Sequence, residues 1–332
     1  MFAFELKKYI RGYSMLLLLL GSAYFGSLMF MGGTTDDKTK DLYEEYIYKL
    51  EGSMDDEKEG YILSEKEKMD RGKWECEHVS EKSDPDYQAI DYYLQHQMAW
   101  EMIYDRYINI MGMDNDGERM MYDDLNLQRF FKQSKVNYYE LLAFLIIVLY
   151  AVVLDYRNNR HLMIKTSANG GFRYIVTKQN GVMFISVITS LFFSIIQYLY
   201  ILICGESSKL SYPIRSMCDF SGVKWSVSVC EYLLIRDCIH VMWCVVVALA
   251  TCCVGIIVRK LQTGLFVALF ITILPIQINR MSERKPLMWI CSVYLDKEYA
   301  VASYSVSAVA WALVCFIVLY LVNGLVWMRY KT

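Results

Sequence analysis

Six long apolar stretches alternate with polar segments along this chain. They cover residues 15–31, 139–154, 181–204, 239–258, 263–278 and 301–326. Because a hydrocarbon layer about 30 Å thick is crossed by roughly 20 apolar helical residues, each stretch predicts a membrane-spanning helix. The stretch at 263–278 is the weakest, since it is short and carries Pro275 and Gln277 near one end. The pattern predicts an all-α polytopic membrane protein with six transmembrane helices.

The residues before the first apolar stretch, 1–14, predict an amphipathic helix on the cytoplasmic membrane surface. They combine aromatic and basic side chains: Phe2, Phe4, Lys7, Lys8 and Arg11. A basic segment followed by an apolar run is also typical of a signal peptide. No small-x-small cleavage site follows here, and the run is long enough to span. We therefore interpret 15–31 as a retained helix.

Composition and charge narrow the class of protein. The chain has 332 residues, of which 55% are hydrophobic, with a mean hydropathy of +0.22 and a formal net charge of −2. That charge is unevenly spread, because residues 34–138 contain 26 Asp and Glu against 14 Lys and Arg. The basic residues gather beside apolar stretches, as membrane flanks do. These features exclude a disordered chain, a disulfide-stabilised small domain and a simple cytosolic enzyme, and they predict no nucleic-acid partner.

Basic residues in short flanking segments predict the orientation. With a cytoplasmic N-terminus, the inside segments carry two acids, Glu5 and Asp155, against twelve bases. The bases are Lys7, Lys8, Arg11, Arg157, Arg160, Lys165, Arg173, Lys178, Arg259, Lys260, Arg329 and Lys331. We therefore predict a multi-pass protein of the cell membrane with both termini, including the tail 327–332, in the cytoplasm. Segments 32–138, 205–238 and 279–300 then lie outside.

The outer segment 32–138 is too long for a loop without structure, so it predicts an extracellular helical domain. Its first helix starts at Thr35 or Asp36 and is closed by Gly52. The second covers 57–69 after a capping-box-like start at 53–56, and the third covers 84–111. A fourth runs from Glu118 through Phe130 into the second span. The apolar spacing of the third helix is interpreted as core packing rather than a ligand surface, through Ile90, Leu94, Met98, Met102 and Ile103.

Candidate metal chemistry in this segment is weak. Residues 114–117 with Asp123 partly match a calcium loop, but the first ligand position falls on Gly112 and the last lacks the usual Glu. Residues 75–78 offer two acids, Cys76 and His78. Because these four residues are consecutive, their side chains cannot all face one ion. The chain has no H-E-x-x-H and no G-x-x-x-x-G-K-[ST] motif. We predict no metal site, no catalytic site and no cofactor bound by this chain.

Ten cysteines are scattered along the chain. Most lie in or beside predicted spans, where a free cysteine behaves as a small hydrophobic residue. Cys76, Cys218 and Cys291 fall outside on the predicted topology. The sequence leaves open whether two of them form a disulfide.

Polar residues near the spans raise the question of function, because charges at membrane depth are costly. Arg236 and Asp237 precede the fourth span, and we interpret them as part of an interfacial or re-entrant helix whose charges reach water. Glu140, at the outer end of the second span, is interpreted in the same way. Gln197 and Asn323 lie mid-helix. Interhelical hydrogen bonds are favoured for these two, and a place on a substrate path stays open.

The cytoplasmic segment 155–180 carries the most specific signal. Asp155 closes the second span, a basic stretch and a Thr-Ser-Ala-x-Gly turn at 166–170 follow, and Arg173 and Lys178 precede the third span. This arrangement resembles the permease subunits of type-2 ABC exporters. The N-terminal amphipathic helix, the six spans and the close fourth and fifth spans fit that family along the whole chain. The insertion between spans one and two, starting near 52–58, is similar to that of permeases from Gram-positive bacteria.

The resemblance implies a transport subunit that is not itself an enzyme. Residues 155–166 would form a coupling helix on a separate ABC ATPase, which would bind ATP and magnesium. Its contact residues would be Asp155, Arg157, Arg160, Leu162, Met163, Ile164, Lys165 and Thr166. Residues 1–14 would be the elbow helix, and a second copy or a sister permease would complete the path for a peptide, antibiotic or lipid-like cargo. The alternative is a sensing or immunity protein whose outer domain binds a peptide.

Overall fold

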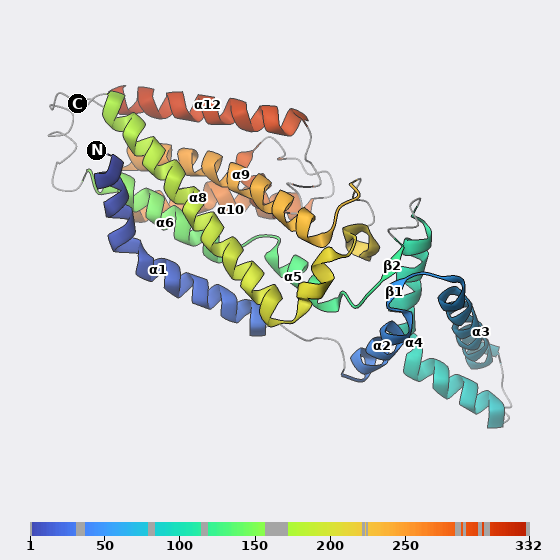
Figure 1. Ribbon diagram of the computed structural model, residues 1–332. Helices are drawn as coiled ribbons and strands as arrows, with labels where there is room; N and C mark the ends of the chain where they lie inside the picture. Colours follow the sequence, from blue (N-terminus) through green and yellow to red (C-terminus); the bar gives the residue numbers. More distant parts are fainter. Residues whose placement is uncertain are drawn as a thin grey trace. The chain divides into compact units, whose positions relative to one another are not determined.

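The computed structural model describes residues 2–30, 37–78, 84–113, 119–156, 172–220, 223, 225–282, 287, 290–297, 301 and 306–329. Over these residues the chain is almost entirely helical (Figure 1). It divides into two compact units. The span unit comprises Met1–Phe30, Phe131–Ile203 and Leu233–Thr332, and the acid-rich unit comprises Met31–Phe130 and Cys204–Tyr232.

The span unit is built from long apolar helices. They are α1 (Phe2–Phe30), α6 (Tyr138–Val153), α8 (Phe172–Ile203), α9 (Val229–Val258), α10 (Leu261–Met281) and α12 (Val306–Arg329), with the short 3₁₀ helix η6 (Cys291–Leu295). Six helical regions in the described chain are long and apolar enough to cross a membrane. The prediction of an all-α fold with six such helices is confirmed at this level.

Helix α8 runs through the middle of the span unit and packs against α1, α6 and α12 (Figure 1). Helix α6 also packs against α1 and α10. Gly255 of α9 faces α6, where an added Cβ would lie only 2.9 Å from Cγ1 of Val152. A side chain at this position would force the two helices apart, so glycine permits their close approach.

Two predicted boundaries differ from the structure. The expected elbow at 1–14 and the first span form one helix, α1, because no proline interrupts its backbone hydrogen bonds. Helix α9 begins at Val229, ten residues before the predicted start of the fourth span at Ile239. Arg236 and Asp237 therefore lie within a long continuous helix, and the interfacial or re-entrant helix predicted for them is not present.

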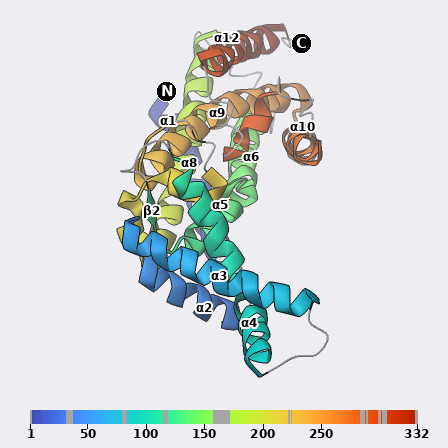
Figure 2. The same ribbon diagram turned by 90° about the vertical axis from the view of Figure 1, so that its right-hand side faces the viewer.

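The acid-rich unit is built around α4 (Asp84–Met111), on which α2 (Asp37–Leu50) and α3 (Asp56–His78) both pack (Figure 2). Strand β1 (Gly52–Ser53) pairs antiparallel with β2 (Met120–Met121). Gly52 has a φ of +102°, a conformation that favours glycine, and it closes α2 as predicted. Aromatic, Met and aliphatic side chains of all these elements fill one core, which includes Tyr46, Trp100 and Ile103.

The helices of this unit follow the predicted order with three corrections. Asp55 is the residue that caps α3, since its Oδ1 accepts a hydrogen bond from the Lys58 backbone N–H at 2.9 Å. Helix α3 continues to His78 rather than ending near Met69. Ile90 and Ile103 of α4 are buried as predicted, but Leu94 and Met98 are exposed. The core-facing side of α4 is formed by Ala99, Ile103 and Ile110, and at about 100° per residue Leu94 and Met98 lie on the opposite side of the helix.

The predicted fourth helix is confirmed only over residues 125–134, because residues 120–121 form β2 and the helix does not continue into the second span. Helix α5 (Leu125–Ser134) ends before α6 begins, so no continuous helix leads from the acid-rich segment into the second span. Asn137 starts the new helix after this break. Its Oδ1 accepts a hydrogen bond from the Glu140 backbone N–H at 3.1 Å and so caps α6. The N–H groups of a first helical turn have no acceptor within the helix, and an asparagine at the N-cap supplies one with its side-chain oxygen.

The segment Cys204–Tyr232 folds together with residues 31–130. It contains the short 3₁₀ helices η3 (Glu206–Ser211), η4 (Ile214–Ser216) and η5 (Cys218–Phe220). The Lys209 ammonium lies 2.8 Å from Glu206 and 3.0 Å from Asp123. Burial disfavours the charged form of Lys209, but hydrogen bonds with Glu206 and Asp123 outweigh it and raise its pKa. Asn126 donates a hydrogen bond to Glu206 at 2.8 Å, which adds a second tie between the two segments.

The remaining sites considered in the acid-rich segment give no ligand set in the described residues. Residues 114–117 of the calcium-like loop lie outside them, and Asp123 is held by Lys209. The ring of His78 stacks on Trp74, and Glu75 lies 3.8 Å from Arg71. Cys76 and Cys291 are free thiols.

Candidate functional site

Charged side chains meet inside the span unit, between α8, α9 and the segment after η6. Arg236 Nη2 donates a hydrogen bond to Gln197 Oε1 at 2.8 Å and lies 3.4 Å from Asp237 Oδ1. Lys297 Nζ lies 3.2 Å from the same Asp237 oxygen and 3.3 Å from Gln197 Oε1. All four residues are buried. One carboxylate and one amide oxygen are thus shared between two cations.

Two further helices contribute to this network. Gln197 Nε2 donates to the Tyr24 hydroxyl of α1 at 3.0 Å, and Arg236 Nη1 donates to Ser134 Oγ of α5 at 2.9 Å. The Arg236 guanidinium also lies over the Phe131 ring, 5.5 Å from its centroid. The interpretation that Arg236 and Asp237 reach water is wrong. Both charges are buried because Asp237 pairs with Arg236 and Lys297, while Gln197 and Ser134 accept hydrogen bonds from the Arg236 guanidinium.

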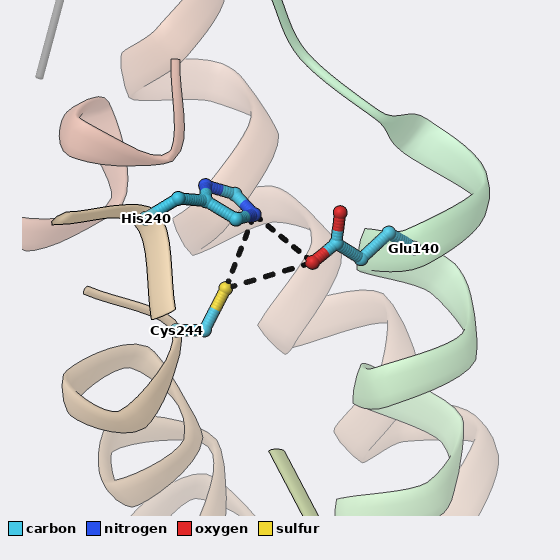
Figure 3. Close-up of side chains that lie close together, drawn as sticks. All are labelled: Glu140, His240 and Cys244. Carbon is cyan, nitrogen blue, oxygen red and sulfur yellow. Dashed lines mark hydrogen bonds and ion pairs between the residues drawn. The ribbon is translucent and has the colours of Figure 1, made fainter. Parts of the chain in front are cut away.

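A second cluster lies one helical turn further along α9. His240 Nε2 is 2.9 Å from Glu140 Oε1, and Cys244 Sγ is 3.4 Å from His240 Nε2 and 3.9 Å from Glu140 Oε1 (Figure 3). His240 and Cys244 are four residues apart, so they project from the same face of α9 toward the first turn of α6. All three side chains are buried, which corrects the expectation that Glu140 reaches water.

A small cavity adjoins this cluster. Its volume is about 10 Å³, roughly the room that one water molecule needs. Its lining is apolar except for Asn137 and the cluster itself. Glu140 Oε2 and His240 Nδ1 are buried and have no hydrogen-bond partner among the described residues. Unsatisfied polar atoms beside an open space are the features of a site that can take a small polar ligand.

A third cluster ties together the ends of α6 and α8. Asp155 accepts a hydrogen bond from the Tyr174 hydroxyl and forms an ion pair with Lys178. Lys178 Nζ also lies 3.4 Å from the Tyr174 hydroxyl. Asp155, Tyr174 and Lys178 are 2%, 3% and 0% exposed. This buried ion pair joins the end of α6 to the first two turns of α8.

Aromatic side chains extend this third cluster to α12 and to the end of α9. Trp327 is buried, and its ring lies 5.4 Å from that of Tyr174 and 6.1 Å from that of Tyr156. The Arg259 guanidinium lies over the Tyr156 ring at 5.4 Å. Four helices are therefore joined at this end of the span unit.

The sequence-predicted site residues divide into three groups. Asp155 is described, whereas Arg157, Arg160, Leu162, Met163, Ile164, Lys165 and Thr166 lie outside the described residues. The elbow residues Phe2, Phe4, Lys7, Lys8 and Arg11 belong to α1. Gln197 and Asn323 are buried and form interhelical hydrogen bonds, since Asn323 Nδ2 donates to the Leu249 carbonyl at 3.0 Å. Both polar groups are thus engaged within the helix bundle.

His240, Cys244 and Lys297 belong to buried clusters that the sequence did not predict. The four-residue spacing of His240 and Cys244 on an apolar helix is a visible signal, but their partner Glu140 is 100 residues away along the chain. Lys297 meets Asp237 across 60 residues. Neither pairing has a signature in local sequence.

Comparisons with protein-family models, with curated proteins and with solved structures find no match to this chain.

Proposed function

We propose that this chain is the membrane-spanning subunit of an ATP-driven exporter and that a separate ABC ATPase binds its segment 155–166. The observation that carries the proposal is the buried cluster of Asp155, Tyr174 and Lys178. A segment that transmits the movement of a partner must be attached rigidly to the helices that it moves. The cluster fixes Asp155, the first residue of this segment, to the first turns of α8, and Trp327 connects it to α12.

The grouping of connecting segments supports the proposed topology. Residues 31–130 and 204–232, both expected outside, fold into one unit. Asp155, Lys178, Arg259 and Trp327 are all in or beside segments expected on the cytoplasmic side, and they belong to one cluster within the span unit. A six-span chain with cytoplasmic termini brings these segments to the same side.

The charged network of Gln197, Arg236, Asp237 and Lys297 supports a role in moving a cargo. Intramembrane charges that compensate one another are typical of substrate pathways and of the elements that gate them. Helix α12 leaves large apolar side chains exposed, among them Leu321 at 56% and Leu325 at 61%. In a permease these would face lipid or a second membrane-spanning subunit, with the cargo path between the two.

A sensing or immunity protein is the second candidate. It is favoured by the exposed apolar side chains of α4, where Tyr87, Leu94 and Met98 are 58%, 59% and 68% exposed. These positions could hold an extracellular peptide. That function requires no ATPase, so association with an ATPase distinguishes the two candidates.

We expect the full-length protein, purified from native membranes in mild detergent, to carry an ABC ATPase with it. The variant carrying Leu162→Asp and Ile164→Asp should lose at least about 90% of this ATPase, because charges in an apolar docking surface are left without partners. The control Ser64→Asp lies on an exposed face of α3 and should leave the yield unchanged. Quantitative mass spectrometry of the eluates measures the ratio. An ATPase that is absent from the wild-type eluate, or equally present with all three, would contradict the proposal.

A further inference from the structure

We propose that Glu140, His240 and Cys244 form a zinc site that joins α6 to α9. The three ligand atoms are Glu140 Oε1, His240 Nε2 and Cys244 Sγ, and all lie within 4.8 Å of one another (Figure 3). This set of imidazole nitrogen, thiolate sulfur and carboxylate oxygen suits Zn²⁺, which binds all three donors. Two ligands four residues apart on one helix face match a common spacing of zinc ligands.

The separations of the ligand atoms are close to those of a tetrahedral site. With zinc–ligand distances of about 2.0–2.3 Å, tetrahedral ligands lie about 3.3–3.6 Å apart. The three observed separations are 2.9, 3.4 and 3.9 Å. Each differs from the required value by only a few tenths of an ångström. Small side-chain rotations without backbone movement would bring the atoms to coordination distance.

The cavity and the unsatisfied atoms give a second, independent indication of a ligand. The cavity of about 10 Å³ beside the cluster leaves room for a water molecule as a fourth ligand. Glu140 Oε2 has no hydrogen-bond partner among the described residues, so the carboxylate can turn toward an ion without losing a contact. A three-ligand site with an open fourth position is typical of exchangeable or catalytic zinc.

The charges of the site suit an apolar interior. When zinc binds, the Cys244 thiol loses its proton to solvent and the thiolate forms the Zn–S bond, while His240 binds as neutral imidazole. One carboxylate and one thiolate then neutralise the two positive charges of the ion. A neutral centre avoids most of the cost of burying an isolated charge. Glu140 lies in the first turn of α6, so the site lies within about 5 Å of the start of that helix.

Zinc binding to the purified full-length chain tests this site directly and requires no ATPase. The protein is prepared without a histidine tag, stripped with chelator, loaded with zinc and desalted, and its metal content is measured by mass spectrometry. We expect the wild type to retain about one zinc per chain. Cys244→Ser and His240→Asn should lower the affinity, measured against a chromophoric chelator, at least about 100-fold. Cys252→Ser removes a buried thiol two turns further along α9 and should bind as the wild type does.

Cobalt(II) adds a spectroscopic readout, whose first result comes from the wild-type protein alone. Wild-type protein loaded with cobalt should show a thiolate-to-cobalt charge-transfer band, which Cys252→Ser keeps and Cys244→Ser loses. The proposal would be overturned if the stripped wild type retained no zinc and showed no such band. It would also be overturned if Cys244→Ser bound zinc as tightly as the wild type. Because no step uses the transport partner, these outcomes leave the proposed function untouched.

Discussion

Replacing Lys178 with Met is expected to lower the thermal stability of the span unit and to weaken the binding of the proposed ATPase partner at least about tenfold. Lys178 is the buried cation that compensates Asp155, and both are almost fully inaccessible to solvent. Removing one partner of a buried ion pair costs about 3–5 kcal/mol, because the other charge is left uncompensated. Asp155 must then take up a proton or move toward water. Either change alters the attachment of the segment that follows it.

The measurement compares thermal unfolding in detergent and ATPase affinity for three variants. Lys260→Met removes an exposed lysine on the same expected side and should change neither quantity. Adding Asp155→Asn to Lys178→Met removes the uncompensated charge and should restore part of the stability. If Lys178→Met and Lys260→Met behave alike, the cluster does not attach the coupling segment.

Replacing Arg106 with Met is expected to destabilise the acid-rich unit by about 3–5 kcal/mol. Arg106 Nη1 lies 2.7 Å from Asp124 Oδ1 and donates a hydrogen bond to the Tyr43 hydroxyl at 2.8 Å. Asp124 is fully buried, and Gln128 donates to its second oxygen at 2.9 Å. Burial raises the pKa of Asp124, which outweighs the lowering effect of the Arg106 guanidinium. Burying this ion pair therefore costs desolvation free energy, but removing one member costs more because the other charge is left buried and uncompensated.

Hydrogen exchange of the full-length protein measures this effect. Amides of α2 should exchange at least about 100-fold faster in Arg106→Met, since Tyr43 on that helix loses the hydrogen bond from Arg106 and contacts an uncompensated Asp124. Arg71→Met is the matched control, because the Arg71 side chain is 63% exposed and lies 3.8 Å from Glu75. A long ion pair with one member largely in solvent contributes no more than about 1 kcal/mol. Replacing both members by Arg106→Met and Asp124→Leu should recover most of the loss. Equal exchange in Arg106→Met and Arg71→Met would contradict the account.

The six apolar helices and the first and third helices of the acid-rich unit could be predicted from sequence, because their signals are local. Continuous hydropathy marks a span, and Asp84 followed by Pro85 marks the start of α4. The break between α5 and α6 was missed because Asn137 acts as a cap inside what reads as one amphipathic run. Only the capping hydrogen bond of Asn137 distinguishes two separate helices from one continuous helix.

The buried clusters could not be predicted, because each depends on a partner far away in sequence. Lys178 is indistinguishable from an ordinary membrane-flanking base until Asp155 is placed beside it. Arg236 and Asp237 are adjacent and point in different directions, so sequence favours water for both. In the structure, Arg236 instead donates a hydrogen bond to Gln197, and Asp237 forms an ion pair with Lys297. Tertiary compensation, rather than residue type, decides whether such a charge is buried.

The proposed function depends most directly on which side of the membrane each segment occupies, and thiol labelling of intact cells measures this. Cys76 is an exposed free thiol in α3 of the acid-rich unit. A membrane-impermeant maleimide should label wild-type protein in intact cells, and Cys76→Ser should lower the label by about one thiol per chain. In that Cys76→Ser protein, a cysteine introduced by Ser167→Cys should react only after the membrane is permeabilised. Labelling of Ser167→Cys in intact cells, with Cys76 protected until permeabilisation, would contradict the topology and the proposed ATPase contact with it.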